Sequence, residues 1–280
     1  MKMLFLAAVL LISTLLSAHI EPPKTLKEKK EREAGFAKKA AAGMRSTLIC
    51  DRSADAKLLP VVQYYYDNSG RDSLILLHDK EGRLDAIVVQ VYDQFGNLVL
   101  DADRSPEGLL KEMNVLEYDE DGLIWKIVSY DSAWQISGRL SYELMPETAE
   151  VFVTKTDKDN KPEYAISYHY ADSPDFGNCF EIIQNDAAGA LKLRVENEYG
   201  SDGRRTKKHI YGADDSLSYS FAYTYNSAGD FLEIIQTDAD GQLMRTDTYT
   251  YDEKGFVSAF KAIKADGKVM ADRLYQNVFK

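Results

Sequence analysis

A short phrase that returns every 26 residues constrains the fold of this chain more than any other feature. The phrase begins with Tyr-Asp and ends at Gly, as in residues 92–96 (YDQFG), 118–122 (YDEDG) and 251–255 (YDEKG). The phrase-ending positions follow one another in alternating steps of 12 and 14 residues, so that eight 26-residue repeats fill residues 59–280. A fixed period of this length is typical of a repeat architecture.

The repeat has the chemistry of tight turns that alternate with β-strands. Asp or Asn accepts hydrogen bonds from the amides that follow it, and Gly adopts the positive φ of a tight reversal. Between turns, apolar and polar residues alternate with a period of two, which predicts half-buried strands. Because both steps are even, the Tyr of each phrase falls on the same face in every strand. After Asp215, for example, this face carries Leu217, Tyr219, Phe221, Tyr223 and Tyr225.

We therefore expect an all-β fold, a long antiparallel β-meander of about 17 strands. Open sheets beyond about ten strands normally curl or split, so the expected form is a curled or spiralled sheet with its Tyr and Leu face inward. Strands on the 12-residue step are less regular, because they carry apolar residues on both faces. The residues that break the alternation are Trp125, Ile127, Leu232 and Ile234. The step that ends at Gly177 is three residues too long, which predicts that the loop 171–177 protrudes.

The N-terminal residues predict export. Residues 1–18 combine Lys2, an apolar run from Leu4 to Leu16 and a small-residue end at Ala18, which is typical of a signal peptide. An uncleaved anchor is the alternative. We expect a periplasmic, extracellular or cell-surface protein without a membrane span after cleavage. In that compartment Cys50 and Cys179 can form a disulfide, provided that the sheet curls or the N-terminal segment folds back.

Residues 19–45 form a basic neck that differs from the rest of the chain. They contain eight Lys or Arg and four Glu, a net charge of +4, whereas the β domain of residues 46–280 carries −16. Thr25 and Glu28 have the spacing of a capping box, which predicts the start of a helix, and Gly43 is a suitable end. The neck is interpreted as a solvated linker, as a helix docked on the acidic body, or as a segment that binds a partner or a membrane surface.

Charge and motif content exclude several functions. The net charge of −11 disfavours nucleic acid, since phosphate binding needs a basic surface. The four histidines lack the spacing of metal ligands, the acidic turns lack the further ligands of a calcium loop, and no nucleophile elbow or phosphate loop occurs. We expect no cofactor, no metal site and no enzymatic activity.

The phrase Tyr-Asp-x-x-Gly-x-Leu, complete in residues 92–98 and nearly so in 118–124 and 251–257, resembles the YD-repeat (Rhs-like) family. The resemblance covers about four-fifths of the chain. It implies a β-rich shell or surface protein, of the kind that encloses a toxin or is proposed to bind carbohydrate or neighbouring cells. The chain looks like a short exported member without an effector domain, because no such domain follows the repeats.

Tyrosines of the last repeats are the candidate ligand-binding residues. They share one face, where aromatic pairs stabilise a sheet by about 0.2–1 kcal/mol each, and this packing alone can explain them. The alternative is that exposed rings stack on sugar rings while turn Asp and Asn hold hydroxyl groups. The candidate residues are Tyr219, Tyr223, Tyr225, Tyr249 and Tyr251.

The sequence thus predicts a non-enzymatic binding or surface-interaction module whose ligand is a carbohydrate or another component of the cell envelope. The alternative is a structural envelope scaffold that binds another protein through the basic neck or the loop 171–177. An outer-membrane β-barrel ranks third, because charged residues on the face opposite to the tyrosines cannot face lipid. These charged residues are Lys192, Arg194, Glu196, Glu198, Arg205, Lys207 and Lys208. The oligomeric state is not predicted.

Overall fold

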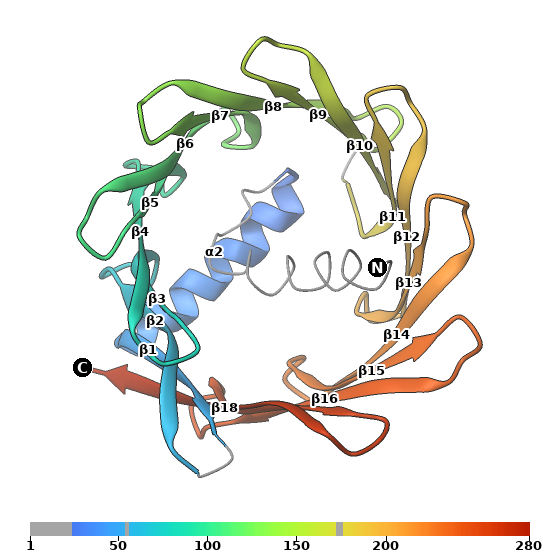
Figure 1. Cartoon of the computed structure of the whole chain (residues 1–280). Coiled ribbons are helices and arrows are strands. Elements are labelled where there is room, and N and C mark those ends of the chain that lie inside the picture. Colours follow the sequence, from blue (N-terminus) through green and yellow to red (C-terminus); the bar gives the residue numbers. More distant parts are fainter. Residues whose placement is uncertain (1–23, 54–55, 172–175) are drawn as a thin grey trace.

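The structure is a computed structural model that describes residues 24–53, 56–171 and 176–280. A single antiparallel sheet of 18 strands follows the order of the chain, and β1 pairs with both β2 and β18. The sheet therefore closes into a barrel around the helix α2 (Leu26–Ala41) (Figure 1). The strands are β1 (Met44–Arg52), β2 (Leu58–Tyr66), β3 (Asp72–His78), β4 (Leu84–Tyr92), β5 (Leu98–Arg104), β6 (Leu110–Tyr118), β7 (Ile124–Asp131), β8 (Ile136–Met145), β9 (Glu150–Asp157), β10 (Pro162–Tyr170), β11 (Cys179–Asp186), β12 (Leu191–Tyr199), β13 (Arg205–Tyr211), β14 (Leu217–Tyr225), β15 (Phe231–Asp238), β16 (Leu243–Tyr251), β17 (Val257–Lys264) and β18 (Val269–Phe279).

Closure of the barrel overturns the predicted fold class, which was an open meander in a curled or spiralled sheet. The additional strand is β1, which precedes the first repeat and does not carry the phrase. It forms a seam with β18, in which Thr47 pairs with Asn277 and Ile49 with Tyr275. An open sheet would leave two rows of unpaired backbone N–H and C=O groups, and the seam pairs both rows.

The turns have the conformation that their residues predict. In the turn of residues 93–97, the Asp93 carboxylate accepts hydrogen bonds from the backbone N–H groups of Phe95 and Asn97, both at 2.9 Å, and Gly96 has a φ of +89°. Repeats that lack Gly keep the same backbone, with a φ of +63° at Asn160 and +59° at Asp215. The register of the repeat therefore continues through its degenerate copies.

A β-bulge at the start of most strands explains the irregular faces of the 12-residue step. Tyr225 pairs with Phe231 but Thr224 pairs with Glu233, so that Leu232 is an extra residue. The bulge places both Phe231 and Ile234 on the inner face and turns Leu232 outward, where it is 43% exposed. Both apolar sets thus have a defined environment.

Tyrosine hydroxyls of the phrase join neighbouring hairpins on the inner face of the wall. The Tyr118 hydroxyl donates to the backbone oxygen of Leu98 at 2.8 Å, twenty residues earlier. Tyr199, Tyr225 and Tyr251 repeat this bond to Cys179, Arg205 and Phe231. Inward apolar side chains pack between these bonds in two clusters, one around Leu98, Leu116, Ile124 and Ile127 and the other around Ala149, Val151, Val153, Tyr170 and Phe176.

The outer face of the barrel is divided into an apolar sector and a charged sector. The apolar sector covers β3 to β7, where paired residues form the rows Leu74, Val89, Ala102, Met113, Tyr130 and Val91, Leu100, Val115, Val128. The charged sector covers β11 to β13, with Glu181, Arg194, Glu196, Glu198, Lys207 and His209 on neighbouring strands. The two sectors lie on different parts of the circumference (Figure 1).

Helix α2 lies inside the barrel and is held at the end where the Tyr-Asp turns gather. The Thr25 hydroxyl caps it by accepting the N–H of Glu28 at 3.2 Å. Lys29 donates to the Asp121 backbone oxygen at 2.6 Å, and Lys38 donates to that of Gly255 at 2.8 Å. The neck segment is thus a docked helix, and its lysines occupy backbone acceptors of the turns. Among the described residues, no helix has the length and apolar character that crossing a membrane requires.

Two further sequence predictions concern residues that the structure describes in part or not at all. The signal peptide 1–18 lies outside the described residues. In the loop 171–177, Phe176 is 7% exposed and packs edge-on against Tyr170 with 5.5 Å between ring centres. This end of the loop therefore folds onto the inner face, although the extra residues were expected to protrude.

Candidate lumenal binding site

An 18-stranded barrel encloses more space than its inward side chains fill. We call this space the lumen. The candidate site is a row of aromatic rings on its wall, from β14 to β17, which we call the lumenal aromatic strip. It consists of Tyr223, Tyr225, Phe231, Tyr249 and Phe260.

Neighbouring rings of the strip are in contact from one strand to the next. The ring centres of Tyr225 and Phe231 are 4.9 Å apart, and those of Tyr223 and Phe231 are 5.6 Å apart. Phe231 is 6.4 Å from Tyr249, which is 5.0 Å from Phe260. These rings are half-buried, so each presents part of its surface toward the lumen.

The structure brings together the candidate residues that the sequence predicts. Tyr223, Tyr225 and Tyr249 belong to the strip, and Tyr251 is bonded to it through its hydroxyl, which donates to the Phe231 backbone oxygen at 2.6 Å. Tyr219 lies on the same face of β14, opposite Ile210 and Asp238. Nothing in the structure tests whether they bind a ligand.

The tyrosine hydroxyls of the strip remain protonated at neutral pH. Burial raises the pKa of Tyr249 to about 12, and the neighbouring Asp247 carboxylate acts in the same direction. Burial also raises the pKa of Tyr223, although the Arg205 cation opposes this shift. The hydroxyls of Tyr223 and Tyr249 can therefore donate hydrogen bonds to a polar ligand, whereas that of Tyr225 already donates to the wall.

Two cations border the strip at β13. The Arg205 guanidinium lies over the Tyr223 ring at 4.7 Å and donates to the Asn197 side-chain oxygen at 3.3 Å. Lys208 lies between Asn197 and Phe221 in the strand register. Within the described part of the chain, neither cation forms an ion pair with a carboxylate. Burial, followed by the Arg205 charge, lowers the pKa of Lys208.

Sequence reasoning misplaced these two cations. Strict alternation groups Arg205 with Lys207 on one face, and the sequence prediction counted Arg205, Lys207 and Lys208 among the charges that cannot face lipid. The bulge in β13 pairs Arg205 with Tyr199 and Lys207 with Glu198, with Thr206 as the extra residue. It therefore turns Arg205 and Lys208 into the lumen and leaves Lys207 outside. The same bulge after every Tyr-Asp turn is the signal that could have located them.

A separate cleft of about 600 Å³ lies between α2 and the wall near β7 to β9. Its lining mixes the apolar Leu26 and Leu144 with the charged Lys27, Lys30 and Glu31. The cleft adjoins the docked helix and not the strip.

One polar cluster has the composition of a nucleophilic triad. On the outer face, His209 lies 2.8 Å from the Ser220 hydroxyl and 3.1 Å from the Glu198 carboxylate. The nearby backbone N–H groups belong to the strand ladder, so they cannot form an oxyanion hole, and Lys207 also binds Glu198 at 3.3 Å. We interpret this cluster as part of the charged outer sector.

The described part of the chain contains neither a cluster of metal-ligating residues nor a disulfide. No group of three or more His, Cys, Asp or Glu residues within these ranges is arranged to hold a metal ion. Cys50 on β1 and Cys179 on β11 are both free thiols, so the possible pairing is not formed here. Burial raises the pKa of Cys179 to about 12.

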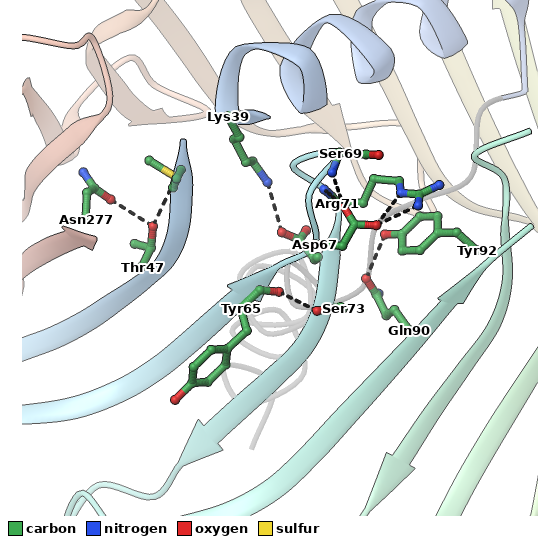
Figure 2. A network of polar contacts seen from close by, with 12 residues as sticks. Lys39, Thr47, Tyr65, Asp67, Ser69, Arg71, Ser73, Gln90, Tyr92 and Asn277 are labelled. Atoms are coloured by element: carbon green, nitrogen blue, oxygen red, sulfur yellow. Dashed lines mark hydrogen bonds and ion pairs between the residues drawn. The ribbon is translucent and has the colours of Figure 1, made fainter. Parts of the chain in front are cut away.

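Figure 2 shows polar contacts between α2 and the wall. Lys39 of α2 points toward the wall between β2 and β3. Lys39 forms a 3.0 Å ion pair with Asp72, which is 7% exposed, and its cation lies 4.3 Å from the Tyr66 ring centre. This contact fixes the C-terminal half of the helix against the β2 and β3 part of the wall.

Comparisons with known proteins give limited information. No protein-family model matches the chain, and no curated protein matches it either. The YD-repeat resemblance is thus not confirmed by a family model.

Among solved structures, the chain is similar to a porin-like protein from Bacteroides uniformis, with 11% identity, a TM-score of 0.44 and coverage of 85% of this chain and 98% of that one. A porin-like protein from Bacteroides vulgatus shares 11% identity at a TM-score of 0.32, with coverage of 85% and 99%. The Tc holotoxin pore of Photorhabdus luminescens shares 13% identity at a TM-score of 0.18, and the match covers 76% of this chain but 16% of the toxin chain. At TM-scores below 0.5, these similarities establish no shared function.

Proposed function

We propose that the chain is a non-enzymatic, exported barrel protein of the cell envelope that binds a carbohydrate in its lumen. The observation that carries the proposal is the lumenal aromatic strip, in which contacting rings on four neighbouring strands face an enclosed space. Sugar rings present apolar C–H faces that pack on aromatic rings, while hydroxyls are held by convergent polar groups. The strip supplies the rings, and the hydroxyls of Tyr223 and Tyr249 supply polar groups.

The position of α2 supports lumenal binding over the scaffold alternative. A scaffold that binds its partner through the basic neck needs that segment to be accessible. Here the neck helix is inside the barrel, and the side chains of Lys29, Lys38 and Lys39 are already bonded to the wall. A partner would have to displace these contacts before it could bind.

The outer surface argues against the outer-membrane barrel. A membrane barrel needs an apolar band around its whole circumference, and each charged side chain at the midplane costs about 2–4 kcal/mol. The charged sector places Arg194, Glu196, Glu198 and Lys207 in the middle of neighbouring strands on the outside. This part of the wall therefore belongs in water.

Glycan-array binding of the purified protein tests the proposal. Tyr223→Ala and Tyr249→Ala should each weaken binding at least about tenfold, because stacking surfaces of this kind are worth about 1.4 kcal/mol or more. Tyr65→Ala is the matched control, since alternation along β2 turns this tyrosine outward. Unchanged binding in both lumenal variants, or equal loss in the control, rejects the strip as the binding surface.

A further inference from the structure

Arg205 and Lys208 form a cationic pair on the lumen wall, and neither forms an ion pair with an acidic side chain among the described residues. Two other cations on the same wall have a carboxylate partner: Arg245 pairs with Asp247 at 2.8 Å and Arg273 pairs with Asp51 at 2.9 Å. The cationic pair lies at the β13 edge of the lumenal aromatic strip.

The structure holds Arg205 in a fixed position. Its guanidinium stacks over Tyr223 and donates to Asn197, and the Asn197 amide is itself fixed by a 3.0 Å bond to the Cys179 backbone oxygen. Asn197 is 9% exposed. The Arg205 Nε atom is buried and has no hydrogen-bond partner among the described residues. A donor that is buried, oriented and unpartnered costs free energy until an acceptor reaches it.

Lys208 provides a second cation, which has no hydrogen-bond acceptor and no ion-pair partner within residues 24–53, 56–171 and 176–280. Its ammonium lies 6.0 Å from the Phe221 ring centre, and its cross-strand neighbours on the inner face are Asn197 and Phe221. Repulsion between two desolvated cations is relieved by one anionic group placed between them. Arg binds planar oxo-acids through two parallel N–H groups, while Lys acts as a point charge.

We propose that Arg205 and Lys208 bind the carboxylate of an acidic sugar, a uronic acid, whose ring lies on the strip beside Tyr223. This assignment rests on the proposed carbohydrate-binding function and narrows it to anionic glycans. The sugar ring would pack on the aromatic rings of the strip, and its carboxylate would bind the two cations beside them. A sulfate or phosphate ester on a sugar shares the chemistry of the anion, so the test includes a free inorganic anion.

The test is calorimetric titration of the full-length protein with three probes: a galacturonic acid hexamer, the same hexamer with its carboxylates methyl-esterified, and inorganic sulfate. The acid should bind at least about tenfold more tightly than the ester, which corresponds to the loss of a charge-assisted pair. Binding of the acid should weaken about tenfold in Arg205→Gln and in Lys208→Met. It should be unchanged in Lys207→Met, a lysine on the same strand that faces outward.

The outcomes separate this assignment from the function on which it rests. Equal binding of acid and ester overturns the anionic assignment but leaves lumenal carbohydrate binding standing. Sulfate that binds as tightly as the acid hexamer assigns the pair to a free anion and also overturns it. If neither hexamer nor any neutral glycan binds the wild-type protein, the proposed function itself fails. The ester comparison uses the wild-type protein, so it decides the matter even if a variant does not fold.

Discussion

Lys39 of helix α2 and Asp72 at the start of β3 form a 3.0 Å ion pair in which the carboxylate is almost completely buried. Burial raises the pKa of Asp72, and the Lys39 cation opposes this shift. The pair therefore links the position of the helix to the charge state of the wall.

Lys39→Met should destabilise the protein by about 3–5 kcal/mol at neutral pH, since it leaves a buried carboxylate without its partner. Because the folded-state pKa of Asp72 is raised, its contribution to stability is fully present below the unfolded pKa and is lost as pH rises through the folded value. Without Lys39 the pKa should rise further. The stability difference between variant and wild type, measured by urea unfolding, should thus shrink on acidification. A difference that is constant with pH would show that Asp72 is not the group involved.

Gly70→Ala should displace the helix. Gly70 has a φ of +76°, and an added Cβ would lie 2.8 Å from the Ala40 backbone nitrogen, as well as against the Phe36 carbonyl. Gly108 has a φ of +84° but nothing within 4 Å, so Gly108→Ala carries the backbone strain alone, about 1–3 kcal/mol. Limited proteolysis of residues 24–43 should be faster in the first variant than in the second. Equal rates would contradict the close packing of the helix on this turn.

Tyr225→Phe should separate the two roles of the phrase tyrosine. It removes the 2.7 Å bond from the hydroxyl to the Arg205 backbone oxygen but keeps the ring. We expect a loss of about 0.5–1.5 kcal/mol in the free energy of unfolding with unchanged glycan affinity. A loss of affinity without a loss of stability would assign the hydroxyl to the ligand instead of the wall.

Affinity for an acidic sugar should fall as pH rises through the lowered pKa of Lys208, and therefore at a lower pH than for an ordinary lysine. The sign follows from the requirement for the protonated ammonium. Lys208→Arg keeps its charge at high pH, so its affinity should stay level over the same titration. A parallel decline in both proteins would point to another titrating group.

Cys179 should react with iodoacetamide only slowly at neutral pH. Its pKa is raised to about 12 by burial and by the Glu28 carboxylate of the helix region, so the thiolate is scarce. Gly70→Ala, which displaces the helix, should speed the reaction, whereas Gly108→Ala should not. Mass spectrometry of the alkylated protein gives the rates, and rapid alkylation of the wild type would contradict the placement of Glu28 beside this thiol.

The regular part of the fold was predictable because each repeat specifies its own turn and strand. The Asp93 to Gly96 turn needs no information beyond its four residues. Closure was not predictable from the repeats, because it depends on a strand outside them. Residues 44–52 carry no phrase, yet they pair with both β2 and β18. A count of turns therefore falls short by the one strand that closes the sheet.

The residues of the site were predictable only where strict alternation along a strand holds. Tyr219, Tyr223 and Tyr225 are separated by even numbers of residues within one uninterrupted stretch, and the structure places them on one face. Arg205 and Lys208 are separated by an odd number, and only the bulge at Thr206 brings them to that face. A period-two pattern cannot reveal such a pair unless the extra residue is known.

The seam between β1 and β18 also sets an order of events. It pairs Met44 with Phe279, so the wall cannot close before Phe279 has been synthesised. Helix α2 precedes every strand and is synthesised before them. Because α2 precedes the strands in the chain, the wall can close around it, and the helix need not be threaded into a finished ring. Until β18 arrives, the growing sheet has two unpaired edges, which is the period when the chain is most open to pairing with other chains.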